Sequence, residues 1–225
     1  MSPAMGRAWE RDLQGVGSLW NMLTVVCIKW GKRYGPEYVN KLRAMVARNL
    51  SAPHCFVCLT DDPRGLDCHV LMLTEPLRGW WQKVTLFKAD PYGLTGRLLF
   101  LDLDVVITGS LDALLDYGGG AVNGFVGVTD FCRPALYNSS VFLLNAGSHQ
   151  EVWRDFNGSV IEKMHGDQDW ISSKIHGAPT WPRCWIRSYK FDYQEEKLAP
   201  GTRVVVFHGT PKPHECGGWV KDLWQ

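Results

Sequence analysis

The chain has 225 residues, of which 45% are hydrophobic and 21% are charged. This composition predicts one globular core, because disordered chains carry fewer apolar residues and a larger charge imbalance. The 24 lysine and arginine residues nearly balance the 23 aspartate and glutamate residues, so no overall field favours nucleic acid or an acidic membrane. No apolar run approaches the ~18 residues that a membrane span needs.

Residues 1–18 lack the apolar stretch of a secretory signal and are predicted to be a loose leader, followed by a single domain over residues 19–225. The seven cysteines are odd in number and irregularly spaced, which is typical of a reduced protein rather than of a disulfide framework. Cys55 and Cys58 have the CxxC spacing but lie in an apolar run, so we interpret them as core cysteines. We therefore expect a soluble, cytoplasmic protein.

The first half of the chain alternates between predicted strands and helices. Short apolar runs are typical of strands buried on both faces, and a proline can open a helix because its missing N–H is not needed there. Strands are expected at Leu23–Ile28, His54–Leu59, His69–Leu73 and Leu98–Ile107, and helices at Pro36 to about Leu50, Trp80–Lys88 and Leu111–Tyr117, the last ended by Gly118–Gly120.

The second half is less regular but continues the alternation. Strands are expected at Phe125–Val128, Val141–Leu144 and Arg203–Phe207, and helices at Gln150–Lys163 and Gln168–Ile175. This order predicts an α/β fold in which helices flank a mostly parallel central sheet. Ligands in such folds bind beyond the carboxyl ends of the strands, so the polar residues that follow apolar runs are the candidates for function.

Asp102 and Asp104 interrupt the strongest apolar run, which resumes directly at Val105–Ile107. Alternate side chains of a strand share a face, so the two carboxylates are expected to point the same way. Two ionised carboxylates repel each other unless a cation joins them, and a hard divalent ion is the natural partner. A nucleotide diphosphate would supply further oxygen ligands. The alternative is a strand end at which both acids are hydrated.

The segment Arg97–Ile107 followed by Ser110–Leu115 resembles the GT-A nucleotide-sugar glycosyltransferases, especially family 8, which includes glycogenin and bacterial lipooligosaccharide galactosyltransferases. In that family an apolar strand containing Asp-x-Asp precedes a short leucine-rich helix. Three more segments match in the same order, namely Tyr137–Asn145, Asp167–Ile171 and Gly209–Pro213. The resemblance covers roughly residues 23–213. It implies a GT-A (Rossmann-like) fold and a retaining, metal-dependent transfer of a hexose or pentose from a UDP-sugar to a hydroxyl acceptor.

The resemblance also implies roles for single residues. Gln168 and Asp169 would flank the reacting face of the sugar, and Asp167 would hold the sugar or cap the following helix. The remaining donor-binding residues implied by the family motifs are Lys83, Asp102, Asn138, Ser139, Gly209 and Lys212. Asp130, which follows a predicted strand, is a further candidate for contact with the sugar hydroxyls.

The loop after the first strand is where a GT-A fold places its contacts to the base and the ribose. Trp30 or Tyr34 would stack on the uracil ring, and Lys29, Lys32 or Arg33 would reach a phosphate. A hydrated basic loop is the alternative interpretation.

The third metal ligand departs from the family pattern. Val206 stands where the family has a histidine, and His208 lies two residues further along the same face of the strand. We predict that Asp102, Asp104 and His208 bind Mn²⁺, which suits imidazole better than Mg²⁺ does. A histidine that caps the strand end is the alternative for His208, and His214 is a weaker candidate ligand.

The acceptor is a saccharide or, as a second reading, DNA carrying hydroxymethylated pyrimidines, as in phage glycosyltransferases. The second reading rests on a basic stretch in which Glu37 is the single acid among Lys29, Lys32, Arg33, Lys41, Arg43 and Arg48. Two further classes are a sugar nucleotidyltransferase, whose glycine-rich signature Gly31–Gly35 resembles poorly, and a non-catalytic protein that binds nucleotide sugars.

Overall fold

The computed structural model describes residues 23–117, 123–193 and 197–225. The predicted leader and the break at Gly118–Gly120 lie outside the described residues. The larger sheet has the strand order β3-β2-β1-β4-β7-β6. Its strands are β1 (Leu23–Lys29), β2 (His54–Thr60), β3 (His69–Met72), β4 (Arg97–Leu101), β6 (Phe125–Thr129) and β7 (Tyr137–Asn145). The first four in this order are parallel, and β7 and β6 add antiparallel pairs, so a mostly parallel sheet is confirmed.

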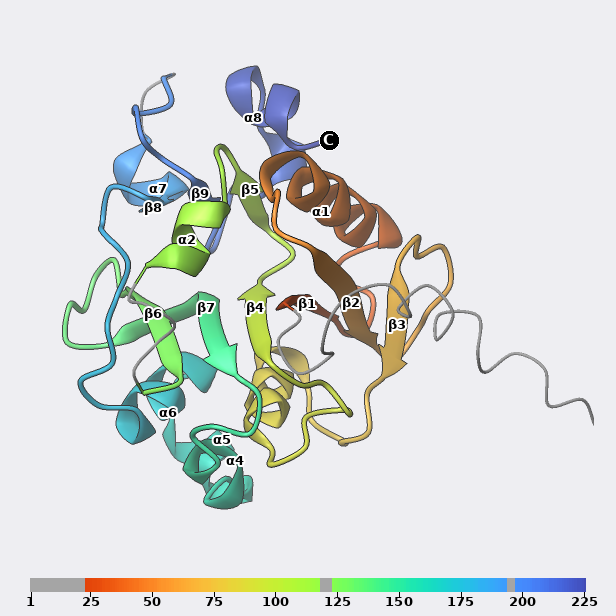
Figure 1. Cartoon of the computed structure of the whole chain (residues 1–225), viewed down its shortest axis with the longest axis vertical. Helices are drawn as coiled ribbons and strands as arrows, with labels where there is room; N and C mark the ends of the chain where they lie inside the picture. The colour runs from red at the N-terminus through yellow and green to blue at the C-terminus, as the bar shows by residue number, and fades with distance from the viewer. Residues whose placement is uncertain (1–22, 118–122, 194–196) are drawn as a thin grey trace, which may run out of the picture.

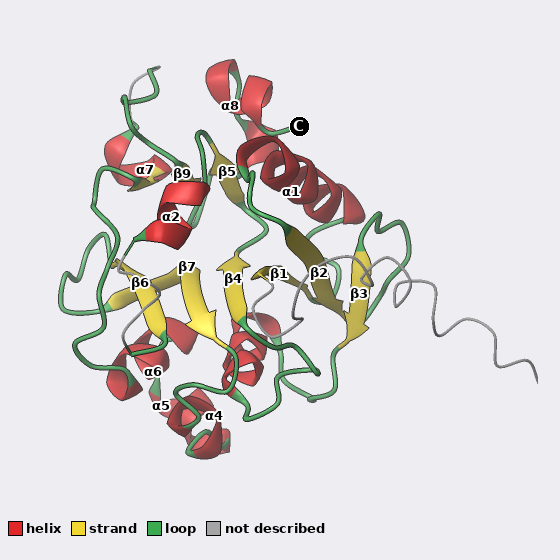
Figure 2. Ribbon diagram, viewed as in Figure 1, coloured by secondary structure: helices red, strands yellow, loops and turns green. Residues whose placement is uncertain are grey.

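Figures 1 and 2 show the larger sheet between two layers. The layer drawn above it contains α1 (Pro36–Asn49), α2 (Asp112–Asp116), α7 (Tyr189–Asp192), α8 (Gly218–Leu223) and a small sheet of β5 (Val105–Ile107), β9 (Val204–Val206) and β8 (Ile186–Ser188). The layer below it contains α4 (Glu151–Arg154), α5 (Gly158–Lys163), α6 (Asp167–Lys174) and the 3₁₀ helix η3 (Gly79–Phe87), and η4 (Pro213–Glu215) is a second 3₁₀ helix.

Each face of the sheet carries its own hydrophobic core. In β4, Leu99 and Leu101 belong to the core shared with α1 and the small sheet, whereas Leu98 and Phe100 belong to the core shared with η3 and α6. This alternation is what a strand buried on both faces produces. Within the described part of the chain, no helix is long and apolar enough to cross a bilayer.

The sequence pattern predicted one strand over Leu98–Ile107, but the structure divides this apolar run into two strands. β4 ends at Leu101 in the larger sheet, and β5 begins at Val105 in the small sheet, where it pairs with β9. Asp102 N–H donates to the Ser140 carbonyl (2.8 Å) and Phe207 N–H donates to the Asp104 carbonyl (3.2 Å), so the two acids are bonded to different sheets. The two acids therefore do not lie on one strand, because the chain turns between them, although both line the same pocket.

Other predicted elements differ in detail. The helix expected at Gln150–Lys163 is divided into α4 and α5, because the Asn157 side chain accepts a hydrogen bond from Ser159 N–H (3.0 Å) and starts a new helix. The helix expected at Trp80–Lys88 is the 3₁₀ helix η3. The sequence pattern did not predict β8, α7 and α8, which have three, four and six residues.

The order of the strands fixes where a ligand can bind. The chain runs from β1 outward to β2 and β3, and then returns to β4 on the other side of β1. The carboxyl ends of β1 and β4 therefore border the point at which the connections diverge, where open α/β sheets form a crevice.

Leu103 anchors the turn between β4 and β5, because it is only 3% exposed and lies in the core between Asp102 and Asp104. We expect Leu103→Ala to lower the free energy of unfolding by about 2–5 kcal/mol. Leu103→Met should cost less than about 1.5 kcal/mol, because it keeps the volume. Urea denaturation measures both, and an alanine variant as stable as the parent would contradict this role.

Candidate active site

A cavity of about 430 Å³ opens at the carboxyl ends of β1 and β4. It is lined by aromatic, charged and small residues from four segments. These are Ile28 in β1, Trp30, Arg33 and Tyr34 after β1, Gly79, Trp80 and Lys83 from η3, Asp102, Leu103 and Asp104 between β4 and β5, and Gly209 and Lys212 after β9. The volume lies in the range of cavities that enclose small-molecule ligands.

The two predicted carboxylates face this cavity, and each is paired with a lysine. Lys83 Nζ lies 3.0 Å from the Asp102 carboxylate, and Lys212 Nζ donates to Asp104 Oδ2. The Tyr34 hydroxyl also donates to Asp104 Oδ2 (2.8 Å). The structure thus brings together five of the residues that the sequence predicted for the site.

Lys83 lies at the centre of the buried part of the site. Its ammonium also lies 3.4 Å from Asp167 Oδ2, and donates to the carbonyl (3.2 Å) and the hydroxyl (3.3 Å) of Ser139. Burial lowers the pKa of Lys83, but the charges of Asp102 and Asp167 outweigh it and hold the pKa above its ordinary value. The side chain therefore stays a cation and connects η3 to β7 and α6.

The carboxyl of Asp102 lies near two other negatively charged carboxylates. Burial raises its pKa, the Lys83 ammonium lowers it, and the charges of Asp104 and Asp167 raise it again, to a net value of about 6. Three carboxylates and two ammonium groups meet here, so the cluster retains a negative charge when all are ionised. Such a cluster favours a further cation.

The loop after β1 agrees only partly with its predicted role. Trp30 and Tyr34 line the cavity, Trp30 being 37% exposed, but the Tyr34 hydroxyl is held by Asp104. Lys29 is buried at the end of β1 and is not among the residues that line the cavity. Arg33, in contrast, does line it, so it is better placed than Lys29 to reach a phosphate.

The residues predicted for the sugar end form a hydrogen-bonded chain. Asn138 Nδ2 donates to Gln168 Oε1 (3.2 Å), and Gln168 Nε2 donates to Asp130 Oδ2 (2.7 Å). Asp169 accepts two hydrogen bonds from the Arg133 guanidinium (2.6 and 3.2 Å). The Gln168 amide is thus held at both ends, which fixes its orientation.

One alternative from the sequence was that Asp167 caps α6, and the structure shows that it does not. Gly166 is the N-cap, and Asp167 is the first residue of the helix, with its side chain turned toward Lys83. Gly166 packs against Trp80, whose indole would lie 3.3 Å from an added Cβ. Lys83 thus pairs with the Asp167 carboxylate, which would otherwise be available to accept hydrogen bonds from the backbone of the first helical turn.

His208 is half-buried between two phenylalanine rings. Its ring is stacked with that of Phe131 (centroids 5.7 Å apart) and lies 5.2 Å from that of Phe191. His208 Nε2 is 2.7 Å from Ser188 Oγ, which also accepts a hydrogen bond from Phe191 N–H (3.3 Å). Because the Ser188 hydroxyl is fully buried, its proton needs an acceptor, so Nε2 accepts it and the neutral ring carries its proton on Nδ1.

The metal ligands predicted from the sequence are not assembled as a set. Among the residues that the structure describes, no group of three or more His, Cys, Asp and Glu side chains is placed to hold a metal ion. Asp102 and Asp104 offer carboxylate oxygens that fit a hard cation, whereas Nε2 of His208 is bonded to the Ser188 hydroxyl. His214 Nδ1 is bonded to the Tyr38 hydroxyl.

Several residues of the site were not predicted. Trp80, which is half exposed at the cavity, lies in the segment that indicated Lys83, so this segment was the available signal. Arg133 and Ser188 have no recognisable pattern around them. Their roles arise from contacts to Asp169 and His208, which are 36 and 20 residues away in the chain.

The fold is that of GT-A glycosyltransferases, as the sequence motifs indicated. The galactosyltransferase LgtC, solved in complex with donor and acceptor sugar analogues, superposes with a TM-score of 0.61 at 17% identity, over 89% of this chain and 95% of LgtC. The glycosyltransferase GlyE of Streptococcus pneumoniae TIGR4 gives 0.65 at 12% identity, over 91% of this chain and 60% of GlyE.

A third neighbour, the bifunctional glycosyltransferase WbbM, gives a TM-score of 0.56 at 12% identity, over 86% of this chain and 47% of WbbM. No protein-family model matches the sequence, and no curated protein matches it either. At these identities the neighbours establish the fold, and the reaction has to be argued from the site itself.

The surroundings of His208 make its protonation testable by NMR. Burial and then the positive charge of Lys190 lower the pKa of His208, Asp130 and Asp104 raise it, and Lys212 lowers it. We expect titration below the ordinary value of about 6.5, the Nδ1–H tautomer in the neutral ring, and a higher pKa in Lys190→Met.

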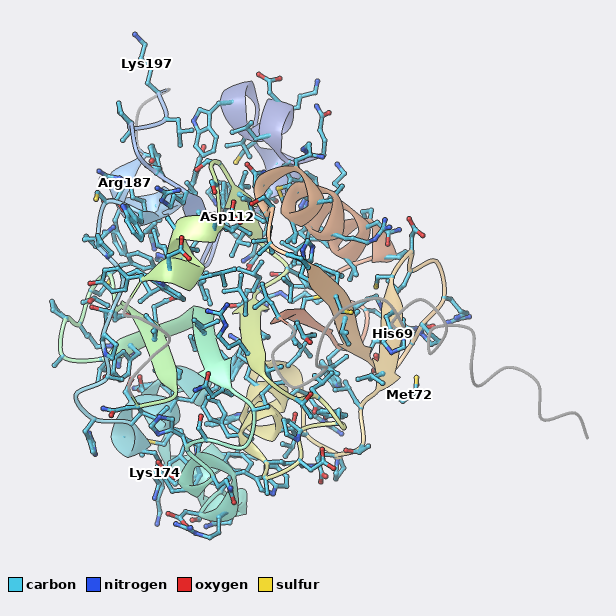
Figure 3. All side chains as sticks on the ribbon, in the orientation of Figure 1. His69, Met72, Asp112, Lys174, Arg187 and Lys197 are labelled. Carbon is cyan, nitrogen blue, oxygen red and sulfur yellow. The ribbon has the colours of Figure 1, made fainter. Side chains whose placement is uncertain are left out.

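Lys174→Met is the matched control, because Lys174 pairs with Asp155 (2.8 Å) outside the cavity and lies at the lower edge of Figure 3. It should leave the His208 titration unchanged. An ordinary pKa, or equal values in the parent and Lys190→Met, would contradict the environment described for this ring.

Proposed function

We propose that this protein is a glycosyltransferase that moves a sugar from a nucleotide diphosphate sugar, specifically a UDP-sugar, to a hydroxyl acceptor. The observation that carries the proposal is the cluster of Asp102, Asp104, Lys83 and Lys212 around one cavity at the carboxyl ends of β1 and β4. Paired acids and buried ammonium groups are suited to a substrate that carries a pyrophosphate and its counter-ion.

At the nucleotide end, Trp30 supplies a partly exposed indole on which a base can stack, and Arg33 faces the same cavity. Asp102 and Asp104 would hold Mn²⁺ or Mg²⁺ together with the diphosphate oxygens. When bound, such a cation acts as a Lewis acid that offsets the negative charge of the departing diphosphate. Lys212 supplies a further positive charge at the same place.

At the sugar end, Asn138, Gln168 and Asp130 form the fixed polar chain, and Ser139 lies against Lys83. We infer that this chain orients the sugar hydroxyls, and that Asp167 and Asp169 shape the reacting side. Retention of the anomeric configuration follows from the resemblance to family 8. No protein nucleophile is required, since electrostatic stabilisation of the leaving group is the main contribution of these residues.

A saccharide is the favoured acceptor. The neighbour LgtC was solved with an acceptor sugar analogue, and the basic stretch that suggested DNA is partly used within the protein. Arg43 pairs with Asp67 (2.8 Å), Arg48 donates to the carbonyls of Leu223 and Gln225, and Lys41 lies over the Trp224 ring. Salt-sensitive retention on duplex DNA carrying hydroxymethylated pyrimidines would favour the second acceptor class.

Binding of the donor can be measured by thermal unfolding with a panel of nucleotide sugars and Mn²⁺. A ligand present at 100 times its Kd stabilises the folded state by about 2.7 kcal/mol, which corresponds to roughly 5–11 °C in Tm for a chain of this length. We expect UDP-sugars to produce this shift and other nucleotide sugars to produce less. A panel that leaves the Tm unchanged would contradict a nucleotide-sugar site.

The role of Asp104 is tested by Asp104→Asn, which keeps the shape and an oxygen acceptor for Tyr34 and Lys212. We expect transfer or donor hydrolysis to fall at least about 100-fold, because the charge that holds the cation is lost. Asp155→Asn, outside the cavity, should retain activity. Full activity in a folded Asp104→Asn variant would refute the assignment, and binding without hydrolysis in the parent would indicate a non-catalytic protein.

A further inference from the structure

The position of Lys212 has a consequence for how ligands enter the site. Its side chain is 11% exposed, and its ammonium donates to Asp104 Oδ2 and to the Phe207 carbonyl (2.8 Å). The Tyr34 hydroxyl occupies the same carboxylate oxygen. A positive charge thus already lies where a divalent cation would approach Asp104.

The other lysine of the site is held differently. Lys83 contacts both oxygens of Asp102, the carboxylate of Asp167, and the hydroxyl and carbonyl of Ser139. Release of Lys83 would therefore break contacts to three residues. The Lys212 ammonium has two acceptors, the Asp104 carboxylate and the Phe207 carbonyl. Because the first of these is the carboxylate that the cation needs, Lys212 is the lysine that can exchange partners.

Hydrogen bonds to Glu215 fix the backbone of Lys212, whereas its side chain keeps several rotatable bonds. Its N–H donates to Glu215 Oε2 (2.6 Å), and its carbonyl accepts from Glu215 N–H (2.9 Å) at the start of η4. The side chain itself is an unbranched four-carbon stem. Rotation of this stem moves the ammonium across the cavity that Lys212 lines without a change in the fold.

We propose that Lys212 is an internal counter-ion that competes with a divalent cation for Asp104 and leaves this carboxylate when a diphosphate offers it a new partner. The proposal rests on the function proposed above. An ammonium and a dication on the same carboxylate repel each other, so the cation binds weakly to the free protein. A bound diphosphate accepts the ammonium, which makes the cation and the nucleotide bind cooperatively.

The proposal gives Lys212 opposite effects on two ligands. Removal of the ammonium strengthens binding of the cation to the free protein, because a competitor is gone, and weakens binding of the nucleotide, because a phosphate contact is gone. If Lys212 had a merely structural role, its removal would not strengthen the binding of either ligand. The sign of the change in cation affinity is therefore the decisive observation.

The experiment measures binding of Mn²⁺ by the electron paramagnetic resonance signal of the free ion, with and without UDP. The variants are Lys212→Met and Lys212→Gln, which both remove the charge. The side-chain amide of the Lys212→Gln variant can still donate a hydrogen bond to Asp104. Without UDP, we expect both to bind Mn²⁺ about 5-fold or more tightly than the parent. UDP should enhance Mn²⁺ binding by a larger factor in the parent than in either variant.

Lys174→Met is again the control, because it removes a lysine from a Lys–Asp pair outside the cavity and changes the net charge equally. It should leave the affinity for Mn²⁺ unchanged, which separates local competition from the long-range effect of charge. Far-UV circular dichroism and the melting temperature establish that each variant is folded.

Equal or weaker Mn²⁺ binding in a folded Lys212→Gln variant would overturn the competition, even if UDP-sugars still raise the melting temperature of the parent. A parent that binds no nucleotide while both variants gain Mn²⁺ would contradict the proposed function and support the competition. Absence of Mn²⁺ binding from the parent and both variants would refute both.

Discussion

The pairing of acids with lysines between the two sheets is the interaction on which the site depends. Asp102 and Asp104 leave the core on either side of buried Leu103, and the chain passes between the sheets at this point. Buried carboxylates without partners would destabilise the fold, so Lys83 from η3 and Lys212 from the segment after β9 neutralise them. Elements distant in sequence thus converge on one turn.

These pairs also hold the neighbouring parts of the site in place. Lys83 connects the turn to Ser139 on β7 and to Asp167 at the start of α6, and α6 in turn positions Gln168 against Asn138 and Asp130. The polar chain of Asn138, Gln168 and Asp130 is therefore built on the same support as the acidic turn. A perturbation of Lys83 is expected to reach both groups of residues, whereas the Lys212 ammonium contacts Asp104 and the Phe207 carbonyl.

Most strands and the principal acids could be predicted from the sequence, because these features depend on local patterns. Apolar runs such as Leu23–Ile28 have to be buried on both faces, and Asp-x-Asp within such a run indicates a constrained pair of charges. The division of Leu98–Ile107 between two sheets could not be predicted, since a residue that leaves one sheet for another has the same local composition as a strand interior. The hydrogen bonds to Ser140 and Phe207 decide it.

The sequence by itself determined the α/β class, the order of the motifs and the identity of Asp102, Asp104, Lys83 and Lys212 as residues of one site. Only the tertiary structure decided which of them are partners, because electrostatic pairing and hydrogen bonding depend on distances across the fold rather than on spacing along the chain. The same holds for His208, where a motif shift suggested a metal ligand and the fold supplied Ser188 and two aromatic rings as its neighbours.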